Sequence, residues 1–154
     1  MNTQSVLRSI YDRWVFVASG LSATAGIIHA YYMPEHFEMW VGYGVFFLAV
    51  TICQVLLALV LLAVRPVSPV VLWAGIISNL SIIAMWIVAR TMGLPLGPMT
   101  GEIEEIGALD LTSKVVEFGV IVCMVALLRM KPDPIANNSM STASDTSVKA
   151  RRLL

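Results

Sequence analysis

Two histidines and several carboxylates lie near the ends of long apolar segments, where their side chains could bind a cation. His29 and His36 both fall in the stretch GIIHAYYMPEHFEMW, residues 26–40, which also carries Glu38. Asp110 and Glu117 begin a later apolar segment. Imidazole and carboxylate together suit zinc, iron, manganese or copper without selecting one of them. We therefore predict a divalent transition-metal site with these ligands: His29, His36, Glu38, Asp110 and Glu117.

The spacing of the two histidines does not by itself define a metal site. On an unbroken helix, seven residues separate them by about 10.5 Å along the axis, which is too far for comfortable ligation of one ion. A break at Pro34, a residue well placed to open a second helix, would bring them closer. Glu35 and Glu38 would then cap that helix. For His36 an interfacial role is favoured, whereas His29 shares a face with small residues inside the bilayer, which makes it a functional candidate.

Glu117 is the more unusual carboxylate because it lies about 10 Å deeper than Asp110 on one helix. Lys114 stands between them, four residues after Asp110 and three before Glu117. One interpretation is a local salt-bridged ladder. In the other, Lys114 satisfies Asp110 and Glu117 pairs with His29 on a neighbouring span. A buried His–Glu pair could bind a metal, hold a proton or lock two helices together.

Composition indicates which elements position these residues. The chain is 58% hydrophobic and 13% charged, with mean hydropathy +0.81, whereas a soluble domain has about 25% charged residues. Long uncharged stretches exceed the roughly 20 residues that cross a hydrocarbon core as a helix. We predict an all-α, four-helix transmembrane bundle with spans at about 14–33, 37–64, 68–91 and 109–129, an outer loop at 92–108, and a disordered basic tail at 131–154.

Charge placement predicts the orientation of the bundle. With four spans, eight of the ten basic residues fall on one side and leave only Arg90 and Lys114 on the other. The positive-inside bias then puts both termini in the cytoplasm and the candidate site outside, in a bacterial cytoplasmic membrane. A rival interpretation makes the first span a cleaved signal peptide, since Ala23-Thr24-Ala25 resembles a cleavage site. Against it, the apolar character continues to Tyr32.

Small and polar residues at steps of three and four predict the inner faces of the helices. Gln54 and Asn79 lie near mid-membrane and could bond each other, while both cysteines act as apolar residues without a disulfide. The Gly- and Pro-rich stretch after Arg90 suits a cap folded on the bundle, with Arg90 paired to Glu102, Glu104 or Glu105. The expected inner faces are Ala18, Ser22, Ala25, Gly26 and His29; Trp40, Gly44, Phe47, Thr51, Gln54 and Ala58; Gly75, Asn79, Ile82, Trp86 and Arg90; and Asp110, Lys114 and Glu117.

Two blocks of the sequence, HFEMWVGYGVFFLAVTICQ and ARTMGLPLGPMTGEIEEIGALDLTSKVVEF, resemble a family of small four-span integral membrane proteins of actinobacterial type. Members of this family are usually labelled uncharacterised membrane proteins. The resemblance covers roughly residues 29–118. It supports the architecture and the outer cluster but implies no activity. The residues it highlights are His36, Trp40, Gln54, Arg90, Gly93, Pro95, Gly97, Pro98, Gly107, Asp110 and Glu117.

These features favour a metal-handling accessory protein over an enzyme. The alternative is a non-catalytic subunit that docks on a larger membrane complex through its acidic loops and glycine-bearing faces. An enzyme would need a nucleophile, a redox cofactor or an open metal position. The sequence has no phosphate loop or dinucleotide fingerprint, and no deep pair of histidines for a haem. The expected partners are the lipid bilayer and either a membrane protein or a second copy, with no nucleic acid.

Overall fold

The computed structural model describes residues 3–130, and this part of the chain is all-helical, with four α-helices and no strands. They are α1 (Thr3–Met39), α2 (Val41–Ala63), α3 (Pro69–Thr91) and α4 (Ala108–Arg129). Each is long and apolar enough to cross a membrane. The predicted four-helix architecture is therefore confirmed, while the expected tail at 131–154 lies outside the described residues.

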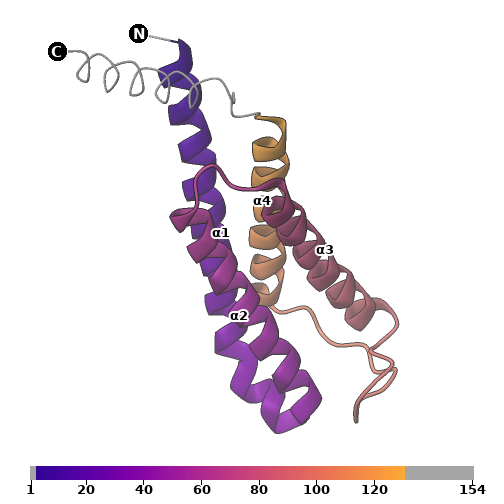
Figure 1. Cartoon of the computed structure of the whole chain (residues 1–154). Coiled ribbons are helices and arrows are strands. Elements are labelled where there is room, and N and C mark those ends of the chain that lie inside the picture. The colour runs from indigo at the N-terminus through magenta and orange to yellow at the C-terminus, as the bar shows by residue number, and fades with distance from the viewer. Residues whose placement is uncertain (1–2, 131–154) are drawn as a thin grey trace, which may run out of the picture.

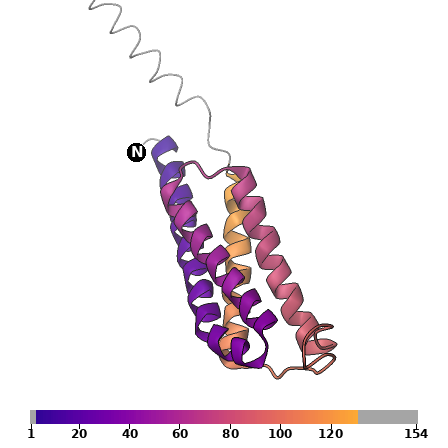
Figure 2. The same cartoon turned by 60° about the horizontal axis from the view of Figure 1, so that its bottom comes forward.

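The helices run alternately up and down (Figure 1). The start of α1, the α2–α3 connection and the end of α4 lie at one end of the bundle, which we call the terminal end. The α1–α2 turn and the α3–α4 connection lie at the opposite end, the loop end (Figure 2). Helix α1 packs mainly on α2 and also on α4, whereas α3 packs on α4 and has little direct contact with α2. Helices α1 and α4 therefore form the centre of the assembly.

The boundary between the first two helices differs from the sequence prediction. Pro34 lies inside α1, and the turn is the single residue Trp40, which has an extended backbone with φ −169° and ψ 136°. Gly44 makes this tight reversal possible, because a Cβ there would lie 2.1 Å from the Phe37 ring. Glu35 and Glu38 thus belong to the last turns of α1, so the prediction that they cap the second helix is wrong.

The predicted inner faces of the helices are largely confirmed. Ser22 of α1 is fully buried and donates to Gln54 of α2, with 2.8 Å to its side-chain oxygen. Gln54 in turn donates to the Asn79 side-chain oxygen of α3 at 3.0 Å, as expected. Trp40 is the exception, since 41% of it is exposed. The polar bridge from α1 to α3 therefore crosses the middle of the bundle, while an apolar core lies toward the terminal end around Val15, Leu61, Leu72, Val120 and Met124.

Candidate functional site: a buried His–Glu–Lys centre

Three ionisable side chains meet inside the loop-end half of the bundle, and we call His29, Lys114 and Glu117 the inner centre. The His29 Nε2 lies 2.7 Å from Glu117 Oε1. The Lys114 Nζ lies 2.8 Å from each oxygen of the same carboxylate. Glu117 has no exposed surface, His29 is 5% exposed and Lys114 is 8% exposed. A histidine from α1 and a carboxylate from α4 thus converge in a site closed to solvent.

The inner centre balances its own charge. Lys114 and Glu117 are three residues apart on α4, a spacing that puts two side chains on one helix face. Their charges cancel, which lowers the cost of a carboxylate at this depth. Because an ionised carboxylate oxygen can only accept, the Nε2–H of His29 donates to Glu117 Oε1. The His29 partner predicted for Glu117 is therefore confirmed.

A second polar group lies nearer the loop end and contains three charged side chains and one tryptophan. We call it the rim cluster: Trp86, Arg90, Glu104 and Asp110. Arg90 donates through Nη1 to Glu104 Oε2 and through Nη2 to Asp110 Oδ2, both at 2.6 Å. The Trp86 Nε1–H donates to the same Asp110 oxygen at 2.6 Å. Half of the ladder predicted on α4 is present, because Lys114 bonds Glu117, whereas the predicted bond from Lys114 to Asp110 is absent from the described residues. Asp110 is instead held by α3.

The connection at 92–107 is folded onto the helices, as the sequence predicted. The Tyr43 hydroxyl of α2 donates to the Leu96 carbonyl at 2.7 Å, and the Glu104 amide donates to the Ala89 carbonyl at 3.1 Å. Gly97 has φ +95°, and a Cβ there would lie 2.5 Å from the Tyr43 hydroxyl. Glycine is therefore needed both for the backbone conformation and for the close approach. The connection ties α2 to α3 where those helices otherwise have little contact.

Phe47 of α2 separates the two histidines. Its ring stacks on His36 with centroids 3.6 Å apart and meets His29 edge-on at 5.6 Å. The Nδ1–H of His36 donates to the Tyr32 carbonyl at 2.8 Å. The sequence placed Phe47 on an inner face but gave no sign that it would stand between His29 and His36. The histidines therefore do not share one pocket.

The five residues expected to form a metal site do not meet as one group. Within residues 3–130, no three side chains of histidine, cysteine or carboxylate type are placed to hold a metal ion. Asp110 belongs to the rim cluster, His36 lies against Phe47, and Glu38 is exposed. His29 and Glu117 alone among the five come together. The chain does not break at Pro34, and the continuous helix α1 keeps the two histidines apart. This is one reason why the five residues do not form one site.

Comparisons with protein-family models, with curated proteins and with solved structures find no match.

Proposed function

We propose that this protein is a multi-pass protein of the bacterial cytoplasmic membrane that binds a cation from the outer side, with His29 and Glu117 as its ligands. The supporting observation is the 2.7 Å approach of His29 Nε2 to Glu117 Oε1 from helices α1 and α4. An imidazole and a carboxylate favour a divalent transition metal. With two protein ligands, water or a partner's group completes the coordination. The role is that of an accessory, metal-handling protein rather than an enzyme.

Lys114 acts in this proposal as a tethered cation that occupies the carboxylate until a metal arrives. Its ammonium contacts both oxygens of Glu117, the position that an incoming metal needs. Asp110 lies four residues earlier on α4, within reach of the same lysine. Its Oδ2 accepts from Trp86 and Arg90, while Oδ1 has no hydrogen bond among the described side chains. Lys114 can therefore turn from Glu117 to Asp110 when the metal binds.

The placement of charge supports the outward orientation. Arg8, Arg13, Arg65 and Arg129 lie at the terminal end of the described chain. The loop-end half carries Arg90 and Lys114, and both are bonded to carboxylates. Because basic residues favour the cytoplasmic side, the terminal end is assigned to the cytoplasm and the inner centre to the outer half of the membrane.

A second candidate function is that of a non-catalytic subunit in a membrane complex. One specific observation favours it: both oxygens of Glu117 already have partners, and no third metal ligand joins them in the part of the chain that the structure describes. The inner centre would then be a lock between α1 and α4. In that case removing Lys114 weakens the bundle without creating any affinity for metal.

Metal uptake distinguishes the two functions. The full chain is purified in detergent, stripped with a chelator and dialysed against Zn²⁺, Mn²⁺, Fe²⁺ or Cu²⁺, and bound metal is measured by elemental analysis. We expect one ion per chain, loss of binding in His29→Ala, and tighter binding in Lys114→Met because the competing ammonium is gone. His36→Ala and Glu38→Gln are matched controls that keep the ion. No uptake by the wild-type protein or by Lys114→Met, or uptake that survives His29→Ala, contradicts metal binding.

A further inference from the structure

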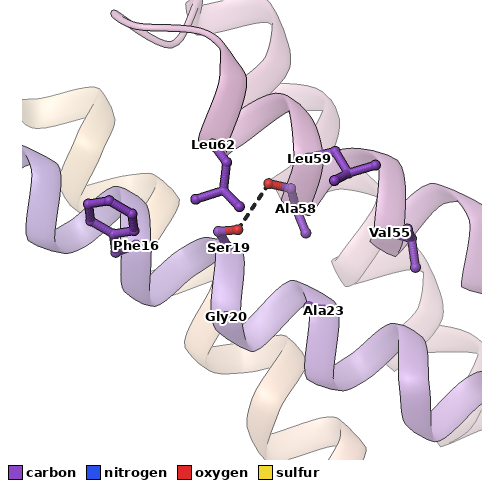
Figure 3. A pocket seen from close by; sticks show the side chains of 8 residues that line it. All are labelled: Phe16, Ser19, Gly20, Ala23, Val55, Ala58, Leu59 and Leu62. Carbon is purple, nitrogen blue, oxygen red and sulfur yellow. Dashed lines mark hydrogen bonds between the residues drawn. The ribbon is translucent and has the colours of Figure 1, made fainter.

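A shallow apolar groove runs along the outside of the bundle between α1 and α2, in its terminal-end half (Figure 3). Its volume is about 450 Å³. Phe16, Gly20 and Ala23 form the α1 wall, and Val55, Leu59 and Leu62 form the α2 wall. From Phe16 to Ala23 the groove follows about 10 Å of the helix axis. It therefore lies parallel to the direction of lipid chains.

The lining is suited to hydrocarbon and to little else. Its one side-chain hydroxyl belongs to Ser19, which donates to the Ala58 carbonyl at 2.9 Å, as Figure 3 shows. Gly20 forms part of the α1 wall, and a Cβ added there would meet no atom within 4 Å. The groove therefore offers an apolar surface with no unsatisfied hydrogen-bonding side chain, and its depth at Gly20 depends on the absence of a side chain.

At the terminal end, the mouth of the groove carries two arginines, Arg65 and Arg13, and one carboxylate, Asp12, so one positive charge there is not offset. The Arg65 guanidinium lies over the Phe16 ring, 4.9 Å from its centroid. Arg65 also bonds Asp12 through Nη1, which leaves its other N–H groups without a bonded partner among the described residues. Arg13 is exposed and lies one turn before Phe16 on α1. A cationic group at membrane-surface level thus joins an apolar channel that leads toward the membrane centre.

We propose that this groove binds one anionic phospholipid, with an acyl chain between α1 and α2 and its phosphate on Arg65. Arginine binds phosphate well because two N–H groups can face two oxygens. The apolar lining fits a chain of methylenes. An apolar transmembrane helix of a second copy supplies no anion for Arg65.

The charge of the assigned leaflet agrees with this ligand. Anionic lipids concentrate in the cytoplasmic leaflet and attract basic residues near the membrane surface. Arg65 and Arg13 lie at the terminal end, the same end as the groove's charged mouth. Both the position of the groove along the bundle and the sign of its charge therefore point to an anionic lipid.

Native mass spectrometry of the full chain, released from vesicles of equal phosphatidylglycerol and phosphatidylcholine, tests the proposal. We expect one retained phosphatidylglycerol in preference to phosphatidylcholine. Arg65→Gln is expected to lower the retained anionic lipid about tenfold, since it removes a charge-assisted bond. Gly20→Leu adds a side chain that extends from the α1 wall into the groove and is expected to lower retention of both lipids.

Two matched variants make the test specific. Ala74→Leu places a leucine on the exposed face of α3, and Arg129→Gln removes a cation from the same end of the bundle. Both are expected to retain lipid as the wild-type protein does. Equal retention of the two lipids by the wild-type protein overturns the assignment, as does unchanged retention in Gly20→Leu. A dimer that Gly20→Leu dissociates would identify a second copy as the occupant.

Discussion

The inner centre and the rim cluster contain the same kinds of charge in different surroundings. The inner centre pairs Lys114 with a carboxylate that has no exposed surface. The rim cluster pairs Arg90 with Glu104 and Asp110, whose side chains are 28% and 20% exposed. Water can replace a lost partner at the rim, but not at Glu117. The same chemical change should therefore have different consequences in the two places.

Glu117→Gln is expected to have the largest effect. It removes the carboxylate that the buried Lys114 ammonium contacts, and breaking a buried pair in this way costs about 3–5 kcal/mol, less whatever a turn of Lys114 toward Asp110 recovers. The double variant Lys114→Met/Glu117→Gln removes both charges and should recover most of that loss. The free energy of unfolding in mixed micelles, followed by circular dichroism, measures both variants. A double variant as unstable as the single one would show that charge pairing is not the cause.

Asp110→Asn should have an intermediate effect. Arg90 keeps Glu104, and partly exposed ion pairs contribute about 0–1 kcal/mol, so we expect a loss of about 1 kcal/mol. The 92–107 connection should be loosened more than the bundle as a whole is destabilised, because Asp110 is one of the residues that hold Arg90, the partner of Glu104 in that connection. Limited proteolysis should cut that connection faster in the variant. A loss of stability equal to that of Glu117→Gln would contradict the expected difference between the rim cluster and the inner centre.

Glu38→Gln should have the smallest effect, although it is the same chemical change as Glu117→Gln. Glu38 is exposed at the end of α1 and has no ion pair within the described residues. Substitutions at such surface positions usually change stability by less than about 0.5 kcal/mol. The same unfolding measurement applies. A change above 1 kcal/mol would reveal a contact that Glu38 makes in the folded protein. Glu38→Gln could then no longer serve as the neutral reference for Glu117→Gln.

The architecture could be predicted because the bilayer permits few alternatives. Backbone groups in hydrocarbon must bond internally, which leaves helices as the solution for long apolar segments. Small and polar residues then identify the inner faces, and this reasoning correctly paired Gln54 with Asn79. It failed at Pro34, because a proline does not have to end a transmembrane helix when local adjustments satisfy the freed backbone groups.

The candidate site was predictable in part. Glu117 lies too deep in its span to lack a partner. His29 was identified as that partner because it lies at a similar depth on a neighbouring span. The partners of Asp110 and Lys114 could not be found in this way, since they depend on how α3 is rotated against α4. The spacing on α4 allows Lys114 to bond either Asp110 or Glu117. Arg90 and Trp86 of α3 bond Asp110, and Lys114 bonds Glu117.

The position of His29 along α1 determines how far the inner centre lies from the water at the loop end. Its 37 residues form a rod of about 55 Å, well beyond a hydrocarbon core of about 30 Å. The charged residues Arg13 and Glu35 are about 33 Å apart along that rod, so they can lie at opposite faces of the lipid. His29 is six residues from Glu35, or about 9 Å. Since that interval is fixed covalently, a thicker or thinner bilayer would change the tilt of the rod while the distance from His29 to the membrane surface at the loop end stays nearly constant.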